Sequence, residues 1–536
     1  MKKRVIAVML VLVLALTMFT GCGTKKTGNT NSDEQMVISV LAIGKSGDHS
    51  GEYVTTLLEK QFNIKLESQF LSNEEYTKKR AMLFSAGNIP DIIYHLDPAY
   101  VKSDVSQDFL AEVDYETIKK YAPDYVDYIN ENEPRVWTYG YVDGKNYGVP
   151  NLYNVGIDPQ TTLWRKDWLD KAGVEKLPET LEELHDTFVK VSNADVDGNG
   201  KKDTYCMSAA MTSYNTGVFS DIFGAYGILP FNWQNDENGS VVYGGTNPKM
   251  KEVLSLLNKW YKEGLIHPEF ITDTATTMNT KFKNGQLLMN FMNGKNIYKK
   301  EPNTIVPITK QLNPDAEFAY TLPVKGPEGS RGGFVFGLGG HIICFGRQIK
   351  DQPEKLQKIL EMINYINTDE EFMLKSRLGE LGTHYKYIDE SQGLAGGIEY
   401  LPPYDNSEER DKQGITGLGV LHSQYGYVLL PVRLDTYAKY RINEERQIFS
   451  NIENPQQYFK TDVFMKTDVV PGAEKSLANI RSSQSEYMMK IIMGEYPVDK
   501  YDDFIKAFNG SLGGAELTAE ANKFYSVQEE IIKKMK

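Results

Sequence analysis

The residues Asp195–Tyr205, with the sequence DVDGNGKKDTY, have the types and spacing of a metal-binding loop. Counting Asp195 as position one, glycine stands at position six, and the Lys201 carbonyl is available at position seven. This is the oxygen spacing of a calcium loop, and a bound Ca²⁺ would offset the repulsion between clustered carboxylates. Side-chain oxygens fall at positions one, three, five and nine, from Asp195, Asp197, Asn199 and Asp203.

The loop differs from a helix-loop-helix calcium sensor at position twelve, where the sensor needs an acid and this chain has Cys206. We therefore interpret the calcium as structural. The alternative is a solvated turn rich in Asp and Asn, which needs no metal. A capping box between Thr180 and Glu183, followed by apolar residues at helical spacing, predicts a helix that leads into the loop.

Residues 37–94 alternate between strand-like and helix-like patterns. Strands are expected at the apolar or alternating runs 37–43, 64–71 and 91–94, and helices at 52–62 and 74–85. This β-α-β-α-β order predicts a parallel, doubly wound sheet. In such sheets ligands bind at the carboxyl ends of the strands, so the loops that follow the strands are candidate binding loops.

Two such loops contain polar side chains. Residues 44–51, GKSGDHSG, have neither the phosphate-binding nor the dinucleotide-binding glycine spacing, but they offer Lys45, Asp48 and His49. His95 follows the third strand. These groups suit hydrogen bonds to a hydroxylated ligand, and a solvated loop tip is the alternative for each of them.

Length and charge limit the class of protein. The chain has 536 residues, of which 41% are apolar and 11% aromatic, so two or more lobes are expected. The net charge of -13 argues against binding to nucleic acid, because a phosphate backbone demands clustered Lys and Arg.

The N-terminus resembles a bacterial lipoprotein leader. Three basic residues precede an apolar run, residues 5–19, which is short for a membrane span and typical of a signal peptide over residues 1–21. The following FTGC resembles a lipobox, with Phe19 in place of the usual Leu, and predicts acylation of Cys22. Residues 22–35 are polar and without periodicity, as expected of a flexible tether. An uncleaved N-terminal anchor is the alternative.

Cys206 and Cys344 are the cysteines that remain after the lipobox, so at most one disulfide is possible. Both have apolar neighbours, which favours buried free thiols.

The chain also resembles extracellular solute-binding protein family 1, in its calcium-containing, alginate-oligosaccharide-binding type. The resemblance rests on ordered landmarks along some 350 residues, among them SAGNIPDIIY, DGKNYGVPN, LWRKDWLDKAG, DVDGNGKKDT, WYKEGLIHPEF and GELGTHYKYID. It implies an α/β, two-lobed periplasmic-binding-protein-like fold with a hinge and a doubly wound sheet in each lobe. In that family an acid commonly stands at position ten of the loop, where this chain has Thr204.

The resemblance also implies a division into lobes that the chain crosses more than once. We place residues 36–150 and 333–382 in the N-terminal lobe. Residues 151–332 and 383–536, with the calcium loop 195–204, form the C-terminal lobe. Such a protein binds its ligand between the lobes and delivers it to the membrane subunits of an ABC importer.

For an oligosaccharide ligand, recognition would combine aromatic rings with hydrogen-bonding side chains. Candidates were chosen at the expected lobe crossings and binding loops, and packing is the equal alternative for Trp164 and Arg165. With Asp48, His49 and His95, the candidates are Asn151, Tyr153, Trp164, Arg165, Asn290, Asn293, Tyr298, His384, Tyr385 and Tyr425.

The expected protein is an exported, lipid-anchored monomer on the outer face of the cell membrane, and not an enzyme. Two alternatives stay open: a binding protein for a peptide or other nonsugar solute, and a secreted, calcium-stabilised glycoside hydrolase, which would need two carboxylates at a fixed separation. The seven His are dispersed and form no zinc motif.

Overall fold

The computed structural model describes residues 35–43, 47–95, 97–153, 160–211, 213–214, 217–293, 305–393, 398–415 and 458–535. The chain divides into a short unit, Met1–Met36, and a large one, Val37–Lys536, which contains every described helix. Among the described helices, none combines the length and the apolar character needed to cross a bilayer.

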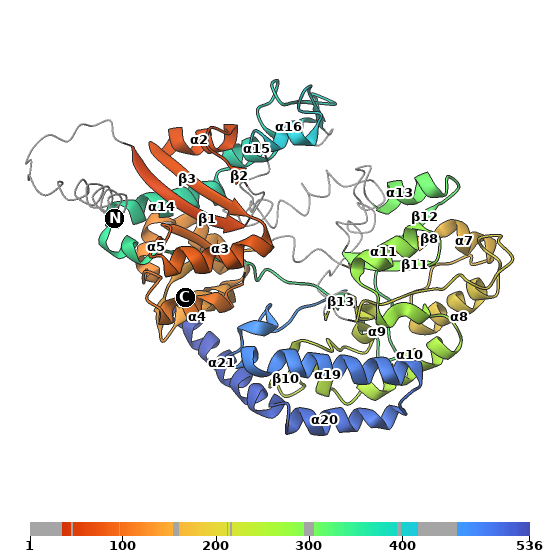
Figure 1. Ribbon diagram of the computed structural model, residues 1–536. Coiled ribbons are helices and arrows are strands. Elements are labelled where there is room, and N and C mark those ends of the chain that lie inside the picture. The colour runs from red at the N-terminus through yellow and green to blue at the C-terminus, as the bar shows by residue number, and fades with distance from the viewer. Residues whose placement is uncertain are drawn as a thin grey trace, which may run out of the picture. The chain divides into compact units, whose positions relative to one another are not determined.

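The predicted β-α-β-α-β order at the start of the large unit is confirmed (Figure 1). Strands β1 (Met36–Ile43), β3 (Ile64–Leu71) and β4 (Ile92–His95) alternate with helices α2 (Tyr53–Phe62) and α3 (Asn73–Ser85). Strands β1 and β4 pair in parallel, as a right-handed crossover requires. A short strand, β2 (Gly47–Asp48), pairs with β3 at the sheet edge.

Two strands from later in the chain complete this sheet, in the order β2-β3-β1-β4-β14-β7. Strand β14 (His341–Phe345) is antiparallel to both β4 and β7 (Gly148–Asn151). Helix α14 (Pro353–Thr368) follows β14 and packs against α2, α5 (Tyr115–Tyr121) and α6 (Pro123–Asn132). Residues distant in sequence therefore share one sheet and one helical layer.

A second sheet has strands β8 (Gln160–Arg165), β11 (Met289–Asn293) and β12 (Phe318–Thr321), with β8 in the centre and antiparallel to both neighbours. The doubly wound, parallel sheet expected in this part of the chain therefore differs from the pairing of the described strands. Side-chain periodicity predicts that a segment is a strand, but it does not encode the direction of the strand's partner.

A large apolar core that includes Trp164, Phe188, Trp233 and Trp260 joins this sheet to helices of the same part of the chain. The predicted capping box is confirmed at the start of α8, since Thr180 accepts a hydrogen bond from the Glu183 N–H. The helices include α7 (Lys166–Lys171), α8 (Leu181–Ser192), α9 (Ser220–Ala225), α10 (Met250–Lys262), α11 (Ala275–Lys283), α13 (Ile305–Leu312), α19 (Ala473–Met493), α20 (Tyr501–Asn509) and α21 (Gly514–Met535). Helices α19, α20 and α21, blue in Figure 1, follow one another in contact, and α19 also packs on α10.

Short strands complete the connections. They are β5 (Tyr141–Val142), β6 (Lys145–Asn146), β9 (Trp233–Asn235), β10 (Val241–Tyr243), β13 (Gly333–Phe334) and β17 (Phe459–Lys460). Cys206 and Cys344 are buried free cysteines, as predicted. Burial in an apolar core raises the pKa of both thiols, so they stay protonated and unreactive.

Described residues of 380–393 and 398–415 contact the start of α2. The Tyr53 hydroxyl donates to Glu380 at 2.8 Å, and the Val54 N–H donates to the Gln413 carbonyl at 3.2 Å. This segment comprises the hairpin β15 (Tyr385–Tyr387) and β16 (Ile398–Tyr400) and the helix α16 (Ser407–Asp411), after α15 (Glu370–Leu378). These contacts hold parts of the segment beside α2, and the division into lobes after Gly382 stays a prediction.

A buried charge network joins β4 to the helices that flank it. Arg80 on α3 donates to both carboxylate oxygens of Asp104 on α4 (Ala99–Ser106), and Nε2 of His95 lies 3.2 Å from Asp104 Oδ2. Burial lowers the pKa of His95, so its imidazole is neutral at pH 7. Burial alone would raise the pKa of Asp104, but His95 and Arg80 hold it below its usual value.

We expect Asp104→Asn to reduce the free energy of unfolding by about 3 kcal/mol, because it leaves the buried Arg80 without a counter-charge. Urea unfolding at neutral pH measures the difference. The pKa of Asp104 is lower in the folded protein than in the unfolded chain. Its contribution to the unfolding free energy is therefore fully present above the ordinary pKa of Asp and is lost as the pH falls through the pKa of the folded protein. The difference should therefore shrink in acid.

The control is Glu74→Gln, which removes an exposed ion pair with Lys78 on the same helix as Arg80. It should change the unfolding free energy by less than about 0.5 kcal/mol. Equal effects of the two substitutions would contradict a special role of the buried network.

Candidate functional site

Three polar residues stand at one edge of the first sheet, where ligands of α/β sheets collect, with Asn151 and His341 on one face and His95 on the other. His95 ends β4, Asn151 ends β7, and His341 begins β14. The register pairs His341 with Asn151 and places His95 opposite the next residue, Ile342. A Cβ on Gly340 would lie 1.9 Å from the Asn151 carbonyl oxygen, so the close approach of β7 and β14 requires glycine there.

Aromatic rings extend this edge. The Tyr153 N–H donates to the Leu338 carbonyl at 2.9 Å, and this bond fixes the chain as it leaves β7. The Tyr153 ring lies edge-on to Phe336 and to His341, with both centroid distances at 6.1 Å, and His341 also contacts Tyr94 at 5.2 Å. We call Tyr94, Tyr153, Phe336 and His341 the aromatic edge.

Phe336 is the most exposed ring of the aromatic edge, with 37% of its surface accessible. A large apolar ring kept in water costs free energy unless something covers it. The ring therefore offers an apolar face of the kind that stacks on pyranose carbons, whereas Asn151 and His341 on the neighbouring strand ends are buried.

The loop after β1 contributes His49, which is buried. Its Nδ1 lies 2.9 Å from Glu52 Oε1, and its ring packs edge-on to Phe70 with centroids 4.6 Å apart. These contacts fix His49 against α2 and β3. Asp48 lies on β2 and pairs through its backbone with Gln69, while its side chain and Lys45 lie outside the described residues.

His95 stands at the sheet edge by position but is fully buried. Its ring is enclosed by Asp104 and by Tyr100, whose ring centroid is 5.8 Å away, and the Tyr76 hydroxyl lies 3.4 Å from its Nδ1. Both ring nitrogens thus face protein groups. This geometry gives His95 a structural role beneath the site.

Trp164 and Arg165 on β8 lie in the core of the second sheet. The Trp164 indole donates to the Thr321 hydroxyl at 2.8 Å. Arg165 donates to Asp167 from Nε and Nη2, at 2.9 and 2.6 Å, and its guanidinium stacks on the Trp168 ring at 4.4 Å. Because Trp164 is 1% and Arg165 3% exposed, the packing alternative is favoured for both.

The remaining candidates divide between two other regions. Asn290 on β11 is buried and donates to Asn279 at 2.8 Å. Asn293 is the last residue of the same strand, and its side chain is not among those that the structure describes. Tyr298 and Tyr425 lie outside the described residues altogether.

His384 and Tyr385 lie in the segment that covers α2. Nδ1 of His384 accepts the Glu380 N–H at 2.9 Å, and its ring is in contact with both Tyr53 and Tyr404, at centroid distances of 5.0 and 4.4 Å. Burial lowers the pKa of His384, so it is neutral at pH 7. Tyr385 is also buried. The described contacts do not bring this pair to the aromatic edge.

The loop 195–204 is exposed and held by turn hydrogen bonds. The Asn199 amide donates to Asp197 at 2.7 Å and to Asp203 at 3.0 Å, and Asp195 accepts the Gly200 N–H at 3.1 Å. The carboxylates of Asp197 and Asp203 thus both accept from the Asn199 amide nitrogen. A hard cation between the two carboxylates could take the place of this donor. Within the described ranges, no three His, Cys, Asp or Glu side chains gather at metal-binding distance. The oxygen donors fit calcium chemically, with amide and carbonyl ligands supplying part of the set.

Sequence reasoning missed Phe336, His341 and Tyr94. All three lie in runs that predict buried strands or loops, and their meeting depends on β14 pairing with β4 and β7. The only signal was the Gly-rich GLGG before His341, which is typical of a close backbone approach.

Comparison with known proteins gives the same class of protein as the fold. The family model described as bacterial extracellular solute-binding protein matches residues 47–370. Lipoprotein LipO of Bacillus subtilis is 24% identical over 532 residues, which cover 98% of this chain and 99% of LipO.

Two solved structures share the fold. The S. pneumoniae ABC-transporter substrate-binding protein FusA in complex with kestose has a TM-score of 0.63 at 16% identity, over 92% of this chain and 99% of FusA. The alginate-binding protein AlgQ2 without calcium ion has a TM-score of 0.64 at 13% identity, again over 92% and 99%. The two-lobed α/β fold of substrate-binding proteins is therefore shown. Because the family model spans more than half of the sequence, the chain belongs to the bacterial extracellular solute-binding protein family.

Proposed function

We propose that this protein is a lipid-anchored receptor that captures an oligosaccharide and delivers it to an ABC importer. Membership of the family already gives the coarser role, which is binding of a solute for import. The oligosaccharide and the lipid anchor are the parts that we add.

The aromatic edge is the single observation on which the oligosaccharide part rests. Phe336 and Tyr153 are partly exposed side by side and offer the apolar ring faces that stack on a sugar ring, while Asn151 and His341 beside them are buried. The ligands named for two similar proteins are also saccharides, since FusA was solved with kestose and AlgQ2 is an alginate-binding protein.

The mechanism is capture and release. A hinged, two-lobed protein populates several arrangements, and a ligand that contacts both lobes selects the closed one. The affinity then depends on the contacts made only in that closed state. No bond in the ligand breaks, so the solute leaves unchanged.

A thermal-shift screen of the soluble chain from about residue 36 tests the substrate class. Kestose and oligomers of alginate, galacturonate and glucosamine should be compared with di- to pentapeptides. A bound ligand raises the melting temperature according to its concentration relative to Kd. A response to a sugar with intact ligand recovered supports the proposal. A response to peptides alone, or recovery of shortened sugar, contradicts it.

Phe336→Ala should weaken binding of the responding oligosaccharide about fivefold, because it removes one stacking face worth about 1 kcal/mol. The melting temperature of the free protein should stay nearly the same, since the ring is already partly exposed. Isothermal titration measures the affinity. Met82→Ala, at a residue 69% exposed on α3, is the control and should leave Kd unchanged. An equal loss of affinity in both variants would contradict binding of the ligand at the aromatic edge.

The lipid anchor has its own test. Cys22→Ser should abolish incorporation of labelled palmitate and release the protein from the membrane fraction into the medium. Cys344→Ser, at a buried cysteine, is the matched control and should stay labelled. Labelling that survives Cys22→Ser would contradict the anchor.

We propose that residues 195–204 hold a structural Ca²⁺ through Asp195, Asp197, Asn199, Asp203 and the Lys201 carbonyl, with Thr204 beside them. EDTA should then lower the melting temperature, and excess Ca²⁺ should restore it. The double variant Asp195→Asn with Asp197→Asn should lose the response. Asp468→Asn, at an exposed acid elsewhere, should keep it. Identical responses of all three proteins to EDTA would contradict a calcium site in this loop.

A further inference from the structure

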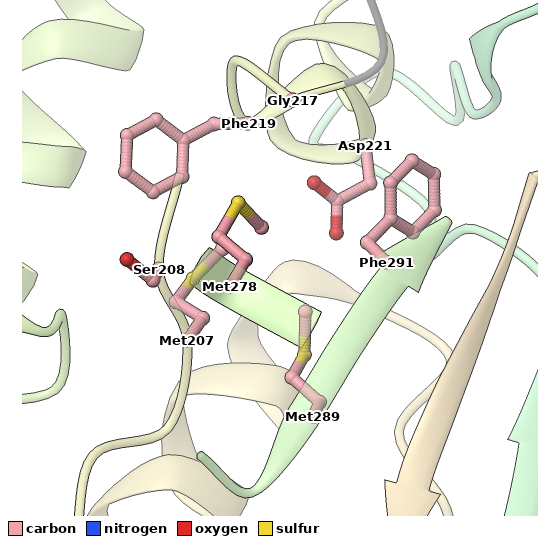
Figure 2. A pocket seen from close by; sticks show the side chains of 8 residues that line it. All are labelled: Met207, Ser208, Gly217, Phe219, Asp221, Met278, Met289 and Phe291. Atoms are coloured by element: carbon pink, nitrogen blue, oxygen red, sulfur yellow. The ribbon is translucent and has the colours of Figure 1, made fainter. Parts of the chain in front are cut away.

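A small cavity lies between the start of α9, strand β11 and helix α11 (Figure 2). Its volume is about 10 Å³, which is room for roughly one water-sized group. Gly217 is half-buried and the other lining residues are buried, so Gly217 marks the side nearest to solvent. The lining residues are Met207, Ser208, Gly217, Phe219, Asp221, Met278, Met289 and Phe291.

Asp221 is the one titratable residue among these eight. It is 3% exposed, and its Oδ1 has no hydrogen-bond partner among the described residues. Figure 2 shows the carboxylate directed toward the thioether of Met278. Burial raises the pKa of Asp221 to about 6, although the N–H groups of Ile222 and of Asp221 itself partly oppose the shift. The carboxylate is therefore mostly ionised at neutral pH, and none of the described residues that line the cavity has a basic side chain to balance it.

Two other buried carboxylates, those of Asp273 and Asp462, accept hydrogen bonds on both oxygens, unlike the carboxylate of Asp221. Asp273 accepts from Lys281 at 2.8 and 2.9 Å and from Ser208 at 2.6 Å. Asp462 accepts from the Trp233 and Phe464 N–H groups, each at 2.8 Å, and from the Thr467 hydroxyl at 2.7 Å. A buried carboxylate without a balancing positive charge lowers the stability of the folded protein. Its presence therefore points to a binding role, in which a ligand supplies the missing charge.

The lining decides what group would complete the site. The Ser208 hydroxyl already donates to Asp273, and the other side chains around Asp221 are thioethers and phenyl rings, which offer no strong donor. Thioether sulfur and ring faces tolerate a cation. A hydroxyl would leave the negative charge unbalanced, and a trimethylammonium group is larger than the cavity. A protonated primary amine matches both charge and size.

The backbone supports a site built for binding. Phe219, which precedes α9, has φ of 56°, a left-handed conformation that costs a bulky residue about 1 kcal/mol or more. A Cβ on Gly217 would lie 2.5 Å from Ser213 Oγ and 2.8 Å from Ala210 Cβ, so this tight turn requires glycine. The turn presents Phe219 and Asp221 to the same cavity (Figure 2).

We propose that Asp221 binds a protonated primary amine of the captured solute, so that the imported ligand is an amine-bearing one, such as an oligosaccharide with free amino sugars. This inference rests on the proposed function only for the saccharide part. The ion pair forms inside a cavity where solvent screening is weak, which gives strong discrimination against the neutral, acetylated form.

The test compares chitotriose with its fully N-acetylated form, and a free-amine tripeptide with its N-acetyl form, by isothermal titration at about pH 7.5, where Asp221 is ionised. Wild-type protein should bind the free amine at least about tenfold more tightly than the acetylated partner. Asp221→Asn should abolish this preference. It should also keep or raise the melting temperature of the free protein, because it removes an unpaired buried charge.

The matched variant is Asp462→Asn, which alters an equally buried but fully hydrogen-bonded carboxylate. It should lower the melting temperature and retain the amine preference in the folded protein. The amine preference of the wild type should also weaken below about pH 6, as Asp221 takes up its proton.

The outcomes separate the two proposals. An amine preference among peptides without binding of any saccharide supports Asp221 as the amine site and overturns the oligosaccharide function. Equal binding of free and acetylated saccharides overturns the inference and leaves the oligosaccharide function standing. The inference is also overturned if Asp221→Asn keeps the preference, if that variant is less stable than the wild type, or if sodium or ammonium chloride alone stabilises the wild type through Asp221.

Discussion

Insertion of β14 between β4 and β7 is the interaction on which the first sheet depends. The strand is fully buried, and its backbone pairs with a segment some 250 residues earlier on one side and some 190 residues earlier on the other. Its first residue, His341, then stands beside Asn151, and its preceding loop brings Phe336 to Tyr153. Such long-range pairing has a high entropic cost, which the burial of Ile342, Ile343 and Phe345 helps to offset.

Buried charges follow two different rules in this protein. Asp104, Asp273 and Asp462 are surrounded by donors, so their ionised forms are compatible with the core. Asp221 is compensated only by the N–H groups of Ile222 and of Asp221 itself, has no partner for Oδ1 among the described residues, and faces a cavity. Proteins commonly retain local instability of this kind at binding sites, because the ligand supplies what the free protein lacks. All four acids are similarly buried. The hydrogen-bond partners of each carboxylate, and not its burial, therefore distinguish an acid that stabilises the fold from one proposed to bind a ligand.

The aromatic residues divide in a similar way. Four of the five tryptophans lie in the core around the second sheet, and Trp164 also hydrogen-bonds across that sheet to Thr321. Phe336 and Tyr153, in contrast, keep part of their rings accessible at a strand edge with polar neighbours. Ring type therefore predicts little about sugar binding here, whereas exposure and the neighbouring polar groups are informative.

The sequence by itself determined the order of elements in residues 37–94, the capping box before α8, the buried free thiols and the family, because these depend on local periodicity or on ordered motifs. Only the tertiary structure decided which strands pair, and hence that β8 runs antiparallel to β11 and β12 and that His384 and Gln413 contact the start of α2. It also decided that Arg165 and His95 are buried beside the carboxylates of Asp167 and Asp104, while Phe336 is exposed and Asp221 Oδ1 lacks a partner among the described residues. The physical reason is that hydrophobic patterning fixes the face of an element that is buried, whereas the partner of a strand or a charge is set by contacts between distant segments.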